Sequence, residues 1–195
     1  RKFHSKTIQA WLKKYCNDHR YFLNCAIFNP FLQQEEINSY YNEILQGKNY
    51  FNIHFHGFIP ENASYNNFLN SAQIVLGMSG GEGWGLPEFN SVALGKHSVI
   101  HNCAGYQEWA NKENSVLVNP SSKVTAHDGK FFVNGAPWNQ GNIFVFNDDD
   151  FITGCEEAIK RVEASSINWA GVKLQHEFTY KKTAEKILDG LKELV

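Results

Sequence analysis

The sequence predicts a single α/β domain in which helices cover both faces of an open, doubly wound parallel sheet. Segments with helical spacing and segments of strand length alternate from Tyr21 to about Val118, as in parallel sheets with crossover helices. Three strand-like segments, around Leu76, Val99 and Val116, are almost continuously apolar, which indicates strands buried on both faces. The length of 195 residues fits one such domain.

Apolar residues at steps of three and four predict the helices. Such stripes cover residues 8–15, 37–45 and 151–162, and the closing helix is expected over about 174–194. Three aspartates, residues 148–150, precede the third stripe, where negative charge favours a helix N-terminus. The expected strands are residues 21–27, 50–56, 73–78, 97–101 and 115–118.

Residues 121–146 interrupt this alternation. Three pairs ending in glycine, at 128–129, 134–135 and 140–141, lie between apolar or aromatic pieces and are typical hairpin signals. We therefore expect an inserted β-hairpin or long loop over the edge of the sheet.

Composition excludes several classes of partner. The 18 Lys and Arg residues against 20 Asp and Glu residues give a net charge of -2, so no basic field favours nucleic acid. The apolar runs are much shorter than the roughly 20 residues of a transmembrane segment. Cys16, Cys25, Cys103 and Cys155 are scattered, which favours free thiols in a reducing, cytoplasmic environment over a zinc site or disulfides.

A glycine-rich turn over Ser79–Pro87 is the most informative segment. It follows a predicted buried strand and opens a helix, and ligands of doubly wound sheets bind beyond such strand ends. Glycines allow backbone amides to approach a ligand, and the positive end of the helix suits phosphate. Glu82 adds a carboxylate that can accept hydrogen bonds from sugar hydroxyls. Together these features suggest a sugar-nucleotide site.

Two other phosphate-binding patterns fit less well. The dinucleotide fingerprint places its glycines after the first strand, with an acidic residue about 20 residues later, whereas this turn follows a later strand. The P-loop needs Gly-Lys followed by Ser or Thr, which the turn lacks. A purely structural glycine turn remains an alternative when the turn is taken alone.

The turn belongs to a longer series of motifs. It reads Glu82-Gly83-Trp84-Gly85-Leu86-Pro87, and a short helix ending in glycine and a strand follow over residues 91–100. Further motifs occupy residues 1–3, 105–108, 114–120 and 178–184. In this order they resemble the motifs of the group 1 (family four) retaining glycosyltransferases, which have the GT-B fold. The similarity covers nearly the whole chain except residues 121–146.

The resemblance implies a function for the domain. Members of the family have two Rossmann-like domains, of which the C-terminal one binds the nucleotide-sugar donor and the N-terminal one supplies the acceptor pocket. The chain resembles the C-terminal domain, one half of a GT-B fold, so we expect the acceptor domain, and with it any peripheral membrane contact, outside this chain. The implied reaction is sugar transfer with retention and without a metal cofactor. The alternatives are a degenerate, non-catalytic domain that binds sugar or a partner, and a nucleotide-binding domain of another enzyme class.

The resemblance also implies site residues. Glu82 matches the residue that contacts the donor sugar, and Lys2 the one that neutralises the diphosphate. The matching turn, whose backbone amides face sugar and phosphate, comprises Gly81, Gly83, Trp84, Gly85 and Leu86. Gly57 and Phe58 match, more loosely, the place of the nucleotide base.

One position departs from the family pattern. Asn90 stands where the family has a second glutamate that binds ribose, so we expect weaker ribose binding or a changed nucleotide preference. Glu88 cannot replace it, because two residues along a helix rotate a side chain by roughly 200°.

Five side chains have alternative interpretations. His54 and His56 share one face of a strand and are expected to pack rather than to bind metal. His101 is expected to be structural, although it lies near the end of its strand. Trp84 either stacks on a sugar or packs beneath the turn, and Glu108 either caps a helix or contacts ligand.

Overall fold

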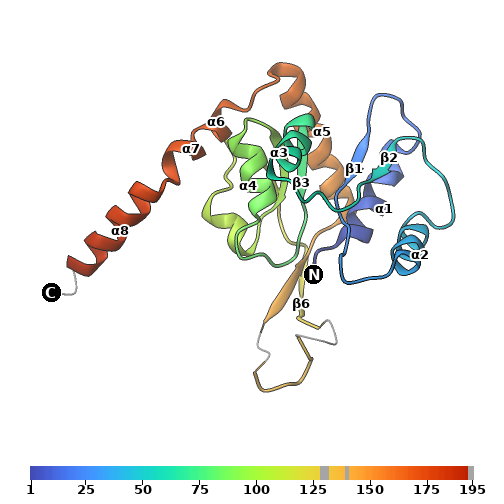
Figure 1. The fold of residues 1–195 in the computed structure, drawn as a ribbon, viewed down its shortest axis with the longest axis horizontal. Coiled ribbons are helices and arrows are strands. Elements are labelled where there is room, and N and C mark those ends of the chain that lie inside the picture. The colour runs from blue at the N-terminus through green and yellow to red at the C-terminus, as the bar shows by residue number, and fades with distance from the viewer. Residues whose placement is uncertain (128–131, 139–140, 193–195) are drawn as a thin grey trace.

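Parallel strands with helices packed on them make up most of the structure, which is a computed structural model that describes residues 1–127, 132–138 and 141–192 (Figure 1). The mixed α/β class is therefore confirmed. The parallel strands are β1 (Leu23–Cys25), β2 (Ile53–Phe55), β3 (Ile74–Gly77), β4 (His97–His101) and β5 (Val116–Val118). Each lies within a segment that the sequence predicts as a strand.

The five parallel strands form two sheets. β1 pairs with β2, with Leu23 opposite Ile53, and the second sheet has the order β3-β4-β5, with Val75 opposite Ser98. The sequence analysis expected one open sheet, and that expectation is wrong at one point: no ladder joins β1 to β3.

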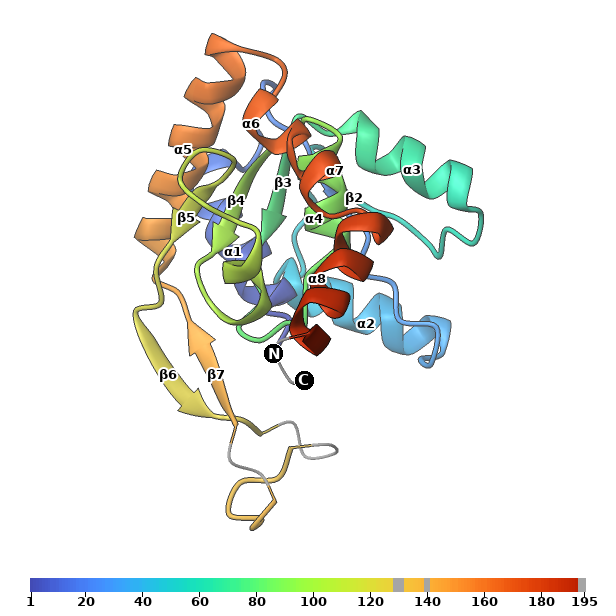
Figure 2. The same cartoon turned by 90° about the vertical axis from the view of Figure 1, so that its left-hand side faces the viewer.

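Helices cover both faces of the three-stranded sheet. α5 (Asp148–Ala164) packs on β4 and β5, and α1 (His4–Tyr15) packs on α5. α4 (Leu86–Ala93) packs on β3 and β4 from the opposite face and contacts α3 (Asn62–Ser71). Figures 1 and 2 show this arrangement, with α2 (Gln34–Ile44) near α1.

Local side-chain interactions explain where two helices begin. At α2, the Gln33 amide donates to the Glu36 carboxylate at 2.7 Å as part of a capping box. At α5, the Asn147 side chain accepts from the Asp149 amide at 2.8 Å. The sequence indicated the aspartates of α5 but not its cap.

The insertion is an antiparallel hairpin, as expected, although it does not lie over the edge of the sheet. β6 (Ser122–Thr125) pairs with β7 (Asn142–Val145), and the hairpin extends away from the sheets (Figure 2). Gly135 has a φ of 82°, which fits its proposed turn, whereas residues 128–129 and 140 lie outside the described residues. The Phe144 amide donates to the Gly80 carbonyl at 2.9 Å, so the base of the hairpin is attached to the glycine-rich turn.

The closing helix is divided. Its expected span of about 174–194 contains α7 (Leu174–Glu177) and α8 (Tyr180–Lys192), preceded by α6 (Trp169–Val172), while residues 193–195 are outside the described part. The break occurs at Phe178, where φ is -109° and ψ is 72°. Thr179 then accepts a hydrogen bond from the Lys182 amide and starts α8, which extends away from the body (Figure 1).

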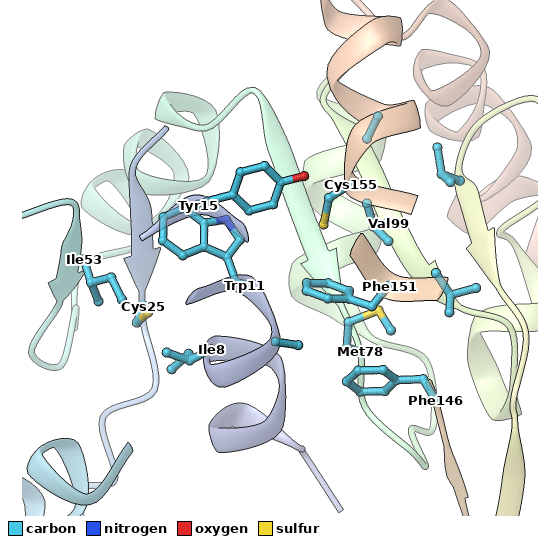
Figure 3. Packing of buried hydrophobic residues seen from close by; sticks show 14 of the residues in the cluster. Ile8, Trp11, Tyr15, Cys25, Ile53, Met78, Val99, Phe146, Phe151 and Cys155 are labelled. Carbon is cyan, nitrogen blue, oxygen red and sulfur yellow. The ribbon is translucent and has the colours of Figure 1, made fainter. Parts of the chain in front are cut away.

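One hydrophobic cluster lies beneath both parallel sheets. Figure 3 shows Trp11 of α1 between Cys25 and Ile53 of the first sheet on one side and Met78 and Phe151 on the other. All four cysteines are free, and three of them are buried, whereas Cys16 is exposed. Burial raises the pKa of Cys25 to about 12, so this thiol is a packing residue rather than a nucleophile.

Candidate functional site

The glycine-rich turn leads from the end of β3 into α4. Gly85 is the N-cap of α4 and has a φ of 75°, and a Cβ atom there would overlap the ring of Tyr106. Gly105, in the short 3-10 helix Ala104–Glu108, donates its amide to the Glu82 carbonyl at 3.0 Å. The segment after β4 therefore packs directly on the turn and fixes its backbone.

The first residues of the chain lie on this turn. The Lys2 ammonium forms an ion pair with the Glu82 carboxylate, although 80 positions separate the two residues in sequence. The Glu82 side chain is 11% exposed and the Lys2 side chain 49%. The Arg1 guanidinium donates to the Gly81 carbonyl at 2.8 Å. The structure thus brings Lys2, Glu82 and Gly81 together at one end of β3.

His4 adds a titratable group beside this ion pair. Burial lowers the pKa of His4, the positive charge of Lys2 lowers it further, and the charge of Glu82 opposes them. Together these effects favour the neutral form of the imidazole near the pair. The sequence analysis did not identify His4, because no motif marks it. The feature of the sequence that could have pointed to His4 is its position two residues after Lys2.

A half-open groove with a volume of about 440 Å³ adjoins His4. It lies beyond the end of β1, between the segment that follows this strand and α2, and its lining is mainly apolar and aromatic. The lining residues are His4, Ile27, Phe28, Asn29, Pro30, Leu32, Ile37, Tyr40 and Tyr41. The sequence analysis assigned no role to the segment after β1, so the groove was missed.

Trp84 packs within an aromatic cluster. Its ring lies 5.6 Å from that of Phe89 and 5.3 Å from that of Phe178, and its carbonyl accepts a hydrogen bond of 2.8 Å from the Trp109 indole. Of the two interpretations of Trp84, the structure therefore favours packing beneath the turn. Leu86, the first residue of α4, is 62% exposed.

Asn90 and Glu88 occupy different surroundings on α4. Asn90 is exposed, whereas Glu88 is half-buried beneath the turn. A Cβ atom built on Gly77 would lie 2.8 Å from the Glu88 Cγ, and one on Gly85 would lie 3.1 Å from its Oε2. Burial raises the pKa of Glu88, and the charge of Glu82 acts in the same direction. Glu88 therefore faces the interior of the site, a role the sequence analysis did not consider.

Gly57 and Phe58 lie on the loop after β2, and among the described residues no ion pair or side-chain hydrogen bond joins them to Lys2 or Glu82. The Phe58 side chain is 66% exposed, and its ring is 6.4 Å from that of Phe28, which lines the groove. Phe58 therefore lies beside the groove rather than beside the ion pair.

The remaining candidates have structural surroundings. His56 Nε2 lies 3.0 Å from the Asn24 side-chain oxygen, and the described residues contain no group of three or more His, Cys, Asp or Glu side chains suited to a metal. His101 is fully buried, with Nδ1 3.0 Å from the Ser79 carbonyl, and burial lowers its pKa. Glu108 is exposed at the last position of its 3-10 helix, so it does not cap the start of that helix.

Comparison with protein-family models and with curated proteins gave no match to this chain. Within the described residues, no helix has both the length and the apolar character needed to cross a membrane.

The arrangement at the turn is chemically simple: a cation and a carboxylate are adjacent, with a helix N-terminus beside them.

Proposed function

We propose that the glycine-rich turn binds a nucleotide-sugar and that the chain is the donor-binding domain, one half of a GT-B fold, of a retaining glycosyltransferase. The observation that carries this proposal is the ion pair between Lys2 and Glu82. The motif resemblance assigns one of these residues to the diphosphate and the other to the sugar, and the two side chains meet at the same point.

The two charges suit the two parts of such a donor. The Lys2 ammonium is half exposed and would turn from Glu82 to the diphosphate oxygens, where the N-terminus of α4 adds partial positive charge. Glu82, released from Lys2, would accept hydrogen bonds from hydroxyls of the sugar. The ion pair thus keeps both groups in place until the donor binds.

Transfer requires the bond between the sugar and the diphosphate to break. Negative charge grows on the departing diphosphate, and Lys2 and the amides at the start of α4 would stabilise it. Removal of one such preorganised group typically lowers the rate about 10²–10³-fold. The acceptor would be held by a second domain, which the proposal places outside this chain.

A thermal-shift screen with UDP-, GDP-, ADP- and TDP-sugars tests the ligand class. A ligand at 100 times its dissociation constant should stabilise the fold by about 2.7 kcal/mol. A stabilising nucleotide-sugar supports the proposal. The proposal is wrong if none of them stabilises the chain while NAD or another adenine cofactor does.

Calorimetry on Glu82→Ala then tests the assigned role. Loss of the carboxylate should weaken binding of the nucleotide-sugar more than that of the matching nucleoside diphosphate, because only the former presents sugar hydroxyls. Glu113→Ala, at an exposed carboxylate on another loop, is the matched control and should change neither affinity. Equal losses for both ligands in Glu82→Ala would contradict the role.

Asn90 favours a second candidate, a sugar- or partner-binding domain without transferase activity. The exposed Asn90 side chain offers a neutral acceptor, whose hydrogen bonds are worth about 0.5–1.5 kcal/mol, against about 1.5–3 kcal/mol for a charged one. Glycan binding without any nucleotide binding would support this second candidate. Tighter nucleotide-sugar binding by Asn90→Glu would support the first.

A further inference from the structure

His4 is the first residue of α1 and follows Lys2 by two positions. Phe3, between them, has a φ of 54°, a left-handed conformation that is uncommon for residues other than glycine. The Phe3 ring packs on the ring of Phe146 at 6.0 Å, and a Cβ atom on Gly80 would lie 2.5 Å from it. The packing of Phe3 therefore fixes the bend that brings both Lys2 and His4 beside the glycine-rich turn.

The half-buried imidazole of His4 is exposed to charges of both signs. Burial lowers its pKa, and the positive charges of Lys2 and of the Arg1 amino group lower it further, whereas the Glu82 carboxylate opposes them. His4 also lines the half-open groove, whose other lining residues are uncharged at neutral pH. His4 is therefore a group that a ligand can reach and that responds to any change of charge at Lys2 and Glu82.

A bound diphosphate would change these charges in one direction. It would draw the Lys2 ammonium away from Glu82 and place negative oxygens beside it, so the cation that opposes protonation of His4 would be compensated. The Glu82 carboxylate, released from its ion pair, would then act on His4 without that cation. Both changes favour the protonated imidazole.

We propose that His4 is a second cation of the donor site, which is neutral in the free chain and takes up one proton from solvent when the diphosphate of the donor binds. The proton goes to the unprotonated ring nitrogen, no covalent bond to the donor forms or breaks, and the imidazolium then pairs with a diphosphate oxygen. The identity of this ligand rests on the proposed function. By linkage, donor affinity falls as the pH rises through the pKa of His4 in the bound chain.

Such a cation would also support the transfer step. Negative charge grows on the diphosphate as it departs, and a positive charge preorganised beside it lowers the barrier. Because His4 is charged only when the donor is present, the free chain avoids repulsion between the imidazolium and the adjacent Lys2 ammonium.

The first test needs no ligand. The pH dependence of the imidazole NMR signals gives the pKa of His4 in the natural chain, in Lys2→Met and in Glu82→Gln. We expect this pKa to rise in Lys2→Met, which removes a cation, and to fall in Glu82→Gln, which removes an anion. Shifts in the same direction would show that the variants act on His4 through packing alone. That result, or the absence of either shift, would overturn the proposal.

Calorimetry in two buffers of different ionisation enthalpy, PIPES and Bis-Tris, measures proton uptake. The ligand is the UDP-, GDP-, ADP- or TDP-sugar that stabilises the chain most, and neither of its esterified phosphates takes up a proton near pH 6. We expect uptake of a fraction of one proton per donor in the natural chain and none in His4→Asn. His19→Asn, at an exposed histidine before β1, is the matched control and should keep the uptake. Uptake that persists in His4→Asn would overturn the proposal, and its loss in Glu88→Gln would place the proton on Glu88 instead.

The pH dependence of affinity separates this role from a structural one. His4→Asn should weaken donor binding about ten-fold or more near pH 6, where a charged hydrogen bond is lost, and by less than about two-fold near pH 8, where the imidazole is neutral. An equal loss at both pH values would mean that His4 only supports the fold of the site, and would overturn the proposal. Donor binding without proton uptake overturns this proposal alone, whereas the failure of every nucleotide-sugar to bind overturns the proposed function as well.

Discussion

The α-carbon of Gly85 lies against the ring of Tyr106 at the start of α4, so this position has no room for a side chain. Gly85 also has a φ of 75°, a conformation that costs other residues roughly 1–2 kcal/mol. Tyr106 is buried and cannot move aside freely, and overpacking typically adds about 1–3 kcal/mol. We therefore expect Gly85→Ala to lower the free energy of unfolding by about 2–5 kcal/mol, measured by urea denaturation.

Gly83→Ala is the matched control for this prediction. A Cβ atom on Gly83 would meet nothing within 4 Å, so the free energy of unfolding should change by no more than about 0.5 kcal/mol. A comparable loss in both variants would show that the turn is sensitive to any substitution rather than to the contact with Tyr106.

Glu88→Gln should make stability less dependent on pH. Burial raises the pKa of Glu88 above its value in the unfolded chain, so the folded state favours the protonated carboxyl. Glu88 therefore adds to the free energy of unfolding at pH values below its pKa in the unfolded chain. This contribution is lost as the pH rises through its pKa in the folded chain. Glutamine keeps the shape without ionising, so the variant should match the natural chain near pH 4 and exceed it at pH 8.

Urea denaturation at several pH values measures this difference, and each unit of pKa shift corresponds to about 1.4 kcal/mol. Glu113→Gln replaces an exposed carboxylate and should leave the pH profile unchanged. A Glu88→Gln variant that is less stable than the natural chain at pH 8 would mean that the ionised carboxylate is needed beneath the turn.

Asn52 holds together the segment that joins α1 to β1. It is fully buried, and its side-chain nitrogen donates to the Tyr15 carbonyl at 2.8 Å and to the Tyr21 carbonyl at 3.0 Å. Asn52→Leu would leave these buried acceptors without that donor, at about 1–3 kcal/mol each. We expect a loss of about 2–4 kcal/mol in the free energy of unfolding.

Asn67→Leu on the exposed surface of α3 is the control and should change stability by about 0.5 kcal/mol or less. Similar denaturation midpoints for the two variants would show that the bonds of Asn52 are replaced by water in solution.

Sequence periodicity predicted the parallel strands and the helices α1, α2 and α5, but it predicted neither α3 nor which strands pair. The apolar runs around Leu76 and Val99 predicted strands correctly, because burial on both faces leaves a direct composition signal. Whether β1 pairs with β3 depends on backbone groups at their edges, which side-chain patterns do not encode. Thr179 similarly starts a new helix after Phe178, and apolar spacing alone predicted one continuous helix there.

The sequence motifs identified Lys2 and Glu82 as candidate site residues, but they did not predict which side chains surround them. The contact of Lys2 with Glu82 could be anticipated only from the order of the motifs, since the two are 80 positions apart. No motif marked His4 or the groove that it lines, because the proximity of His4 to Glu82 arises from the path of the chain into α1. The inward position of Glu88 follows from helix geometry, but the burial that raises its pKa comes from its place beside Gly77 and Gly85.

Lys2→Met should weaken every diphosphate-containing ligand to a similar extent. If the Lys2 ammonium binds the diphosphate, its loss removes a charged hydrogen bond worth about 1.5–3 kcal/mol, or about a ten- to hundred-fold weaker affinity by calorimetry. The nucleoside diphosphate and its sugar conjugate share this group, so both should be affected, unlike in Glu82→Ala. Lys48→Met, at an exposed lysine after α2, removes the same charge and should change neither affinity. If Lys2→Met weakened binding of the nucleotide-sugar alone, this role would be contradicted. Lys2 would then contact the sugar, which the nucleoside diphosphate lacks.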